Sequence, residues 1–340
     1  MKTVAVLWFA ISLLGLSCAS MPQPVAADQT GSDDSSSDAV QLNVYEKIVK
    51  HATAQQVREA IEVGADVHAR YEDGRTALMI AARYNKNPEV MATLLDAGAD
   101  VNARDDEYGA TALMWAAARN TNVEVTKTLI EAGSEVNAVD EDGWTPLMYA
   151  ATRNENPQVA EVLLTARAEV NVRGEKGWTA LMIAASNNKN AEVTATLIAA
   201  RAEVNARTRE GWTALMGAVT HNENPEVTAI LINAGAEINA RTEDGWTTLM
   251  FAARDNENSE MTVALIAAGA EVNARNKWGW TALMYAARDN NNPEVIIKLL
   301  EAGADGAAKS VEGKTAFDYA QENEALRGTA AYWRLNDARF

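Results

Sequence analysis

The chain repeats a short motif about every 34 residues, and this repetition limits its fold more than any other feature. A Gly-x-Thr element recurs along most of the sequence, with a first interval of 35 residues and six further intervals of 34. The repeated glycines are Gly74, Gly109, Gly143, Gly177, Gly211, Gly245, Gly279 and Gly313. A period of this length predicts a linear stack of small helical repeats, each packed on its neighbours, rather than several independent domains.

The residues around each glycine indicate which kind of repeat this is. A 34-residue period is also the tetratricopeptide length, so the period alone does not decide. Most repeats, however, carry Val-Asn-Ala-Arg or a close variant of it shortly before the Gly-x-Thr element, as at residues 101–104 and 272–275. This combination predicts a turn-rich hairpin between helices, which a unit made only of two helices does not have.

The segment Glu141–Ala151 (Glu-Asp-Gly-Trp-Thr-Pro-Leu-Met-Tyr-Ala-Ala) resembles the ankyrin pattern Asp-x-x-Gly-x-Thr-Pro-Leu-His-x-Ala-Ala. The resemblance covers about residues 42 to 338. It implies an all-α ankyrin-repeat solenoid at residues 41–338, in which helix-turn-helix repeats are joined by β-hairpin-like loops. Seven full repeats are expected to start near residues 72, 107, 141, 175, 209, 243 and 277. Shortened capping repeats are expected at both ends, the C-terminal one at residues 311–338.

Each repeat should contain two short helices. Thr76 is the predicted N-cap of the first helix, which should end near Asn85 because Asn tolerates a left-handed C-terminal cap. The second helix should begin at Asn87 and end at Gly98. Its buried face is predicted to contain Val90, Leu94 and Leu95.

We call the residues at equivalent positions of successive repeats a column. Two columns depart from the family pattern. Arg167 and Arg201 replace the glycine that ends the second helix elsewhere, and this would cost about 1 kcal/mol each if the position requires positive φ. Methionine replaces the family's usual His, and we expect it to pack in the apolar core rather than bind copper. These residues are Met79, Met114, Met148, Met182, Met216, Met250 and Met284.

The N-terminal residues do not fit the repeat. Residues 1–17 are predicted to be a signal peptide, because Lys2 precedes an apolar run at Val4–Leu16 that is too short to span a membrane. Leu14-Gly15-Leu16-Ser17-Cys18 resembles a bacterial lipobox, in which Cys18 would be lipidated and become the mature N-terminus. Cleavage after Val25-Ala26-Ala27 is the alternative. Residues 18–40, rich in Ser and Asp, are predicted to be a flexible acidic tether.

Composition excludes several classes of function. The formal net charge of −17 disfavours nucleic acid, because phosphate binding needs clustered Lys and Arg. A single cysteine excludes an internal disulfide and a zinc site with several thiolates, and only three histidines are present. No nucleophile, base and orienting group share a catalytic spacing. We therefore expect no enzyme activity, no cofactor and no metal.

Two columns carry the candidate partner-binding residues. Tryptophan follows the repeated glycine five times, and this row is either a binding stripe or part of the packing between hairpins. The end of the first helix carries polar residues that differ from repeat to repeat, as a protein-binding face would. The candidates are Trp144, Trp178, Trp212, Trp246, Trp280, Arg83, Tyr84, Arg119, Arg153, Asn187, His221, Arg254 and Arg288.

A third column, at the start of each hairpin, is basic: Arg70, Arg104, Arg173, Arg207, Arg241, Arg275 and Lys309, interrupted by Val139. Acidic residues follow within a few positions, for example Glu243 and Asp244 after Arg241. We interpret this column as a structural charge ladder along the hairpins, weak at each pair.

These observations favour a non-enzymatic interaction scaffold. The expected protein is monomeric, exported and tethered in the bacterial cell envelope through lipidated Cys18, in the periplasm or at the outer membrane. It would bind a protein partner on the concave hairpin face, and the lipid anchor would be its only membrane contact. Two alternatives remain: a secreted effector that binds a host protein, and a carbohydrate or cell-wall binder that uses the Trp row as sugar platforms.

Overall fold

The computed structural model describes residues 49–340 apart from residue 72. The predicted signal peptide, Cys18, the tether and the first residues of the N-terminal capping repeat lie outside these residues. Every named element in the described range is a helix, and pairing of extended backbone is limited there to two isolated bridges, Arg70 with Thr76 and Arg241 with Thr247. The predicted all-α repeat architecture is confirmed.

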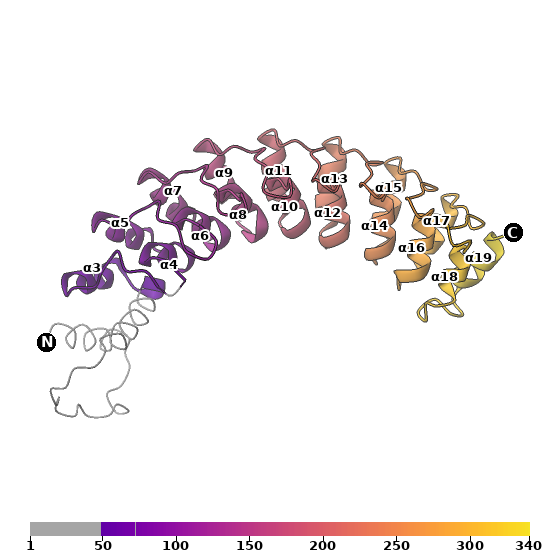
Figure 1. The fold of residues 1–340 in the computed structure, drawn as a ribbon, viewed down its shortest axis with the longest axis horizontal. Helices are drawn as coiled ribbons and strands as arrows, with labels where there is room; N and C mark the ends of the chain where they lie inside the picture. The colour runs from indigo at the N-terminus through magenta and orange to yellow at the C-terminus, as the bar shows by residue number, and fades with distance from the viewer. Residues whose placement is uncertain (1–48, 72) are drawn as a thin grey trace, which may run out of the picture. The chain divides into compact units, whose positions relative to one another are not determined.

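The chain forms two compact units. The N-terminal unit contains the residues up to Ala150 together with Gln158–Glu169, and the C-terminal unit contains Ala151–Pro157 and Val170–Phe340. In the N-terminal unit, α4 packs on α6 in one row, and α3, α5 and α7 form a second row (Figure 1). The bounds are α3 Ala54–Glu62, α4 Ala77–Tyr84, α5 Pro88–Asp96, α6 Ala112–Arg119 and α7 Val123–Glu131. Helices α8 (Pro146–Arg153) and α9 (Pro157–Thr165) contribute residues to both units.

The C-terminal unit repeats the same two rows. Helices α10, α12, α14, α16 and α18 pack successively in the first row, and α11, α13, α15, α17 and α19 form the second (Figure 1). The bounds are α10 Ala180–Asn187, α11 Ala191–Ala199, α12 Ala214–His221, α13 Pro225–Asn233, α14 Thr248–Asp255, α15 Ser259–Ala267, α16 Ala282–Asp289, α17 Pro293–Glu301, α18 Ala316–Ala320 and α19 Ala330–Ala338.

Local sequence explains where these helices begin and end. Thr76 caps α4 with a hydroxyl that accepts a hydrogen bond from the Met79 amide, and Asn87 caps α5 through the Glu89 amide. Gly98 follows α5 with a φ of 95°, and its amide donates to the Leu95 carbonyl. The predicted N-caps of both helices and the glycine after the second helix are therefore confirmed.

The core confirms one of the apolar predictions and corrects another. All seven methionines of the repeated column are buried, with at most 1% of each side chain exposed. The Met79 sulfur also accepts a hydrogen bond from the Thr76 amide at 3.4 Å. In α5, Val90 and Leu94 are buried as predicted, but Leu95 is only half-buried and Met91 is fully buried in its place.

The asparagine that ends each first helix acts differently from the prediction. Asn85 has φ −87° and ψ 122°, so its backbone is extended and the expected left-handed cap is wrong. Its side-chain amide instead donates to the carbonyls of Val49 and Ala52, each at 3.0 Å. Its side-chain oxygen accepts from the Asn87 amide at 2.9 Å. Asparagine is needed here because one side chain ties the preceding repeat to the start of the next helix.

Arg167 and Arg201 occupy the position where the other repeats have glycine. Both have positive φ, 69° and 66°, and they are the non-glycine residues of the described range with this conformation. Both side chains are exposed. The backbone requirement predicted for this column is confirmed, and these two repeats bear its cost of about 1 kcal/mol each.

Candidate functional site

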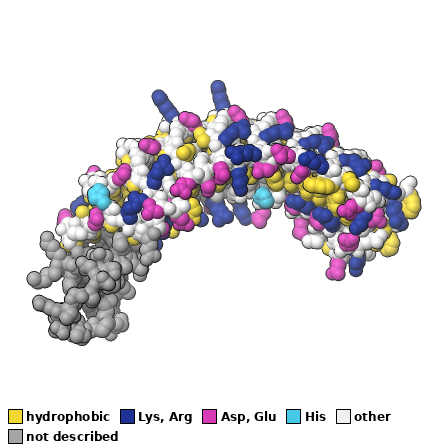
Figure 2. Space-filling model, viewed as in Figure 1, with side chains coloured by type: hydrophobic (Ala, Val, Ile, Leu, Met, Phe, Trp, Pro, Cys, Tyr) yellow, Lys and Arg dark blue, Asp and Glu magenta, His cyan; other side chains and the backbone are white. Residues whose placement is uncertain are grey.

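A continuous row of aromatic rings lies in the C-terminal unit. We call Trp212, Phe251, Trp246, Tyr285, Trp280 and Tyr319, in this order, the aromatic ladder. Successive ring centroids are 4.5, 4.8, 4.1, 4.8 and 4.2 Å apart. Each tryptophan therefore contacts a ring of its own repeat or the next, or both, so the ladder links neighbouring repeats. Figure 2 shows a group of hydrophobic side chains on the C-terminal unit among acidic and basic ones.

Hairpins supply the tryptophans and first helices supply the other rings. The Trp280 amide donates to the Asn276 side-chain oxygen at 3.0 Å, which fixes the backbone at the end of its hairpin. The Asn276 amide group also donates to the Tyr285 hydroxyl at 2.8 Å. One hairpin residue thus positions a ladder tryptophan and the ring on the following helix.

Polar and charged side chains accompany the rings of the ladder. Burial raises the pKa of Tyr285 to about 12, so its hydroxyl stays protonated. Arg254 lies 4.5 Å from the Trp246 ring centroid, and Arg288 lies 4.2 Å from that of Trp280. His221 stacks on Trp212 with 6.3 Å between ring centroids and 7° between the planes.

Each of these two arginines is also held by the aspartate that follows it. The Arg254 guanidinium donates to both carboxylate oxygens of Asp255, at 2.6 and 2.8 Å. Arg288 makes the same two bonds with Asp289, at 2.8 and 2.9 Å, and these raise the pKa of Arg288. The result is a repeated arrangement of ring, guanidinium and carboxylate.

Trp178 belongs to the same column but has no ring partner among the described residues. The helical position that carries a ring in the ladder is Ile183 in its own repeat and Gly217 in the next. A Cβ at Gly217 would lie 2.1 Å from the Ser186 hydroxyl, so a larger residue there would require this side chain to move. Trp178 is half-buried, as are Trp212 and Trp246.

In the N-terminal unit the same columns use hydrogen bonds more than stacking. Trp144 contacts Tyr149 edge-on at 5.8 Å, and the Tyr149 hydroxyl donates to Asp140 at 2.7 Å. Burial, together with this hydrogen bond, raises the pKa of Tyr149 far above its ordinary value. Trp115 likewise donates its indole N–H to Asp105 at 2.8 Å.

Three predicted residues of the N-terminal unit lie together. Arg83, Tyr84 and Arg119 line an open cavity of about 390 Å³, together with Lys86 and Asn120. The Arg83 guanidinium is 4.5 Å from the Trp115 ring centroid and 5.0 Å from that of Tyr84. This brings the end of α4 and the end of α6 into one basic site.

The remaining predicted residues stand apart, and other aromatic residues were missed. Arg153 and Asn187 are exposed at the ends of α8 and α10. Tyr108 and Trp278, which the sequence analysis did not select, are exposed at hairpin tips by 43% and 48%. Their signal was present, because the residue before the repeated glycine is charged in the other repeats.

The ring partners of the ladder tryptophans were missed as well. Phe251, Tyr285 and Tyr319 all lie six residues after a repeated glycine, and Trp115 and Tyr149 occupy the same column. Their constant distance from the glycine is the signal in the sequence that marks this column.

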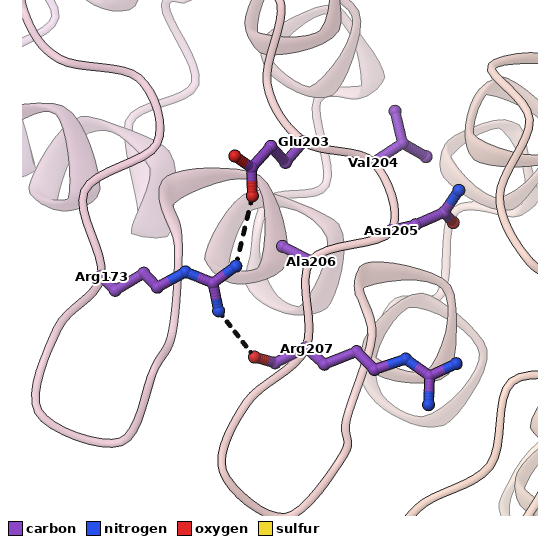
Figure 3. Close-up of a pocket in the computed structure, with 6 residues that line it drawn as sticks. All are labelled: Arg173, Glu203, Val204, Asn205, Ala206 and Arg207. Atoms are coloured by element: carbon purple, nitrogen blue, oxygen red, sulfur yellow. Dashed lines mark hydrogen bonds and ion pairs between the residues drawn. The ribbon is translucent and has the colours of Figure 1, made fainter.

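The basic hairpin column forms the predicted ladder, with different acidic partners. Arg173 donates to the Arg207 carbonyl at 2.9 Å and to Glu203 at 3.2 Å, beside a cavity of about 570 Å³ (Figure 3). The expected pairing of Arg241 with Glu243 or Asp244 is wrong. Arg241 pairs with Glu271 at 2.9 Å, because its side chain extends to the next repeat rather than along its own hairpin. These exposed pairs contribute little individually.

The described part of the chain contains no cluster of three His, Cys, Asp or Glu side chains that could hold a metal. In the same part, each helix is too short or too polar to cross a membrane.

Paired short helices joined by hairpins define a helical-repeat protein. The family model for ankyrin repeats matches residues 39–140, 105–174, 150–242, 181–275 and 249–328. The chain therefore belongs to the ankyrin repeat family. Ankyrin repeats generally mediate protein–protein interaction, and the family is typically a non-enzymatic interaction module.

Two curated relatives share a short stretch with this chain. The mitochondrial disaggregase of Bos taurus is 52% identical over 52 residues, which are 15% of this chain and 8% of that protein. The mitochondrial disaggregase of Homo sapiens is 50% identical over 52 residues, 15% of this chain and 7% of that protein. The chain thus matches less than a tenth of the length of each relative.

Proposed function

We propose that this protein is an exported scaffold of the bacterial cell envelope that binds a protein partner through its hairpins and the ends of its first helices. The observation that carries the proposal is the concentration of Trp, Tyr and Arg on these elements. These residue types dominate the energetics of protein–protein interfaces. Trp278 and Tyr108 offer exposed rings at the hairpin tips, and Arg254 and Arg288 lie over the ladder.

The contacts of the ladder favour a rigid interface over a row of separate aromatic platforms. Trp246 lies against Phe251, Tyr285 and Arg254, and Trp280 is only 8% exposed. A sugar platform needs a free ring face, which these two residues do not offer. A protein partner needs only the ring edges, the exposed hairpin tips and the polar helix ends, all of them held in place by packing.

The location in the envelope rests on the N-terminal sequence. A signal peptide ending at residue 17 and a lipidated Cys18 would leave the acidic residues up to 40 as the link to the repeats. Fractionation of cells that express the full chain tests this point. We expect the wild type in the membrane fraction and Cys18→Ser in the soluble or secreted fraction. A wild type that is entirely secreted would support the alternative of a secreted effector.

Site-specific crosslinking in intact cells tests the binding face. A photoreactive phenylalanine analogue replaces Trp278 at a hairpin tip, and a second variant carries it at Val263 on α15, which is exposed to a similar extent (43%). We expect a discrete protein adduct from position 278 and none from position 263. An adduct only from position 263 would place the interface on the second row of helices and overturn the assignment.

A further inference from the structure

One arginine column contacts a tryptophan ring in three repeats, and in one of them the arginine has no neighbouring acid. Arg83, Arg254 and Arg288 each lie seven residues after the capping threonine of a first helix. All three guanidinium groups lie over tryptophan rings, at 4.5, 4.5 and 4.2 Å. Arg254 and Arg288 are followed by Asp255 and Asp289, which bind them in two-bonded pairs, whereas Arg83 is followed by Tyr84.

Arg83 consequently has no carboxylate of its own. Among residues 49–340 other than 72, none forms an ion pair with Arg83, Lys86 or Arg119. The Arg83 Nε is buried without a hydrogen-bond acceptor, whereas Nε of Arg254 donates to Asp255. A buried donor without a partner is costly, by about 1–3 kcal/mol. A hydrogen-bond acceptor supplied by another molecule would therefore stabilise the Arg83 side chain.

The lining of the cavity beside Arg83 is basic although the whole chain is acidic. Arg83, Lys86 and Arg119 line the same open cavity of about 390 Å³, and Lys50 lies 5.0 Å from the centroid of the neighbouring Tyr84 ring. With a net charge of −17, three cations that share a cavity without an acidic partner form a local exception. The cavity is wide enough to admit the side chain of an acidic residue.

We infer that this cavity binds a carboxylate side chain from an acidic segment of the protein partner. The inference rests on the proposed function and names the chemistry of the partner for the N-terminal unit. Asp255 and Asp289 show that a carboxylate fits the guanidinium of this column, so a carboxylate is favoured over a phosphate. Arg83 provides the fork for two parallel hydrogen bonds, while Lys86 and Arg119 add charge at the rim.

Fluorescence anisotropy with a labelled peptide tests the inference on the full chain at low salt. The probe is a ten-residue peptide of alternating Glu and Ser, and the matched probe has Gln in place of Glu. We expect the Glu peptide to bind and the Gln peptide not to bind. Arg83→Gln should weaken binding by about tenfold or more, because a charged two-bonded pair is lost.

Tyr84→Asp is the more diagnostic variant. It should weaken binding of the Glu peptide as strongly as Arg83→Gln does. The new carboxylate would pair with Arg83 in the way that Asp255 pairs with Arg254. Tyr84→Asn is the uncharged control and should bind within about threefold of the wild type. Lys298→Gln should leave binding unchanged, since that ammonium group already pairs with Glu301 on α17 and is not part of the cavity. Circular dichroism melts establish that each variant is folded.

Two results would overturn the inference. The first is a Glu peptide that binds equally to the wild type, Arg83→Gln and Tyr84→Asp. The second is displacement of the peptide by an equal concentration of inorganic phosphate, which would make the cavity a general anion site. Either result leaves the proposed function intact if the adduct from position 278 persists, whereas loss of that adduct would reject the scaffold itself.

Discussion

The two compact units use the same backbone pattern with different chemistry in one column. Six residues after the repeated glycine, the C-terminal unit has Phe251, Tyr285 and Tyr319, whose rings continue from one tryptophan to the next. The N-terminal unit has Trp115 and Tyr149 in this column, and each is hydrogen-bonded to an aspartate of its own hairpin. The ring-to-ring contacts of the first unit therefore stay within one repeat, while those of the second also connect neighbouring repeats.

This comparison distinguishes the residues that build the repeat from the residues that form its surface. Caps, asparagines and core methionines are shared by both units, so they set the repeat. The aromatic and arginine columns differ, and they determine which ring contacts join neighbouring repeats and which charges are left unpaired. Four measurements test the comparison, from the largest expected effect to the smallest.

Removing a ladder ring should have the largest effect. Trp280→Ala should lower the free energy of unfolding by about 3–5 kcal/mol, because the side chain is 8% exposed and contacts two rings. Trp278→Ala, two residues earlier and 48% exposed, is the matched control and should change stability by less than about 1 kcal/mol. Urea unfolding followed by circular dichroism measures both. Equal losses would show that the ladder is not a stabilising element.

The asparagine column should be equally important in both units. Asn188→Ala in the C-terminal unit removes bonds to the carbonyls of Ala151 and Asn154, and a loss of about 2–3 kcal/mol is expected. Asn120→Ala in the N-terminal unit removes the equivalent bonds and should cost the same. The adjacent, exposed Asn187 gives the control, since Asn187→Ala should be nearly neutral. A large difference between Asn188 and Asn120 would contradict a shared scaffold.

High pH should weaken the ladder through Tyr285. Its pKa is about 12 in the folded protein and 10.0 as the reference value for the unfolded chain. The folded state retains the proton longer, so stability is complete below pH 10 and falls as the pH rises to 12, by about 1–2 kcal/mol from this residue. Between pH 9 and pH 11.5, the free energy of unfolding should therefore fall more for the wild type than for Tyr285→Phe. Parallel decreases would reject the contribution of Tyr285.

Backbone strain should give the smallest effect. Removing it should raise stability, and introducing it should lower stability. Arg201→Gly relieves a positive φ and should raise stability by up to about 1 kcal/mol, partly offset by the entropy of the unfolded chain. Gly235→Ala introduces the same strain and should lower stability by about 1 kcal/mol. No steric clash adds to this loss, because no atom lies within 4 Å of the added Cβ. Melting temperatures of the two variants should move in opposite directions.

The sequence predicted the repeat well because each of its signals is local and recurs many times. The threonine and asparagine caps, the glycine at the end of the second helix and the buried methionines depend on only a few neighbouring residues. Arg201 shows the same: the glycines of its column were enough to predict positive φ.

Predictions failed where a side chain contacts a neighbouring repeat. Asn85 was expected to act through its own backbone, yet it acts through carbonyls more than thirty residues away. Arg241 was paired with acids nearby in sequence, whereas its partner Glu271 is thirty residues further on. The basic cavity was missed for a similar reason, because Arg83 and Arg119 belong to different repeats. The spacing of residues within one repeat does not predict contacts between two repeats.

The asparagine column also has a consequence for how such a chain lengthens over evolution. Each repeat carries the side chain that bonds the carbonyls of the repeat before it, and those carbonyls belong to the backbone whatever their side chains are. A duplicated 34-residue segment therefore brings its own connector and finds acceptors already in place. Gene duplication in whole repeats can extend the array without a compensating mutation, and surface columns are then free to diverge copy by copy.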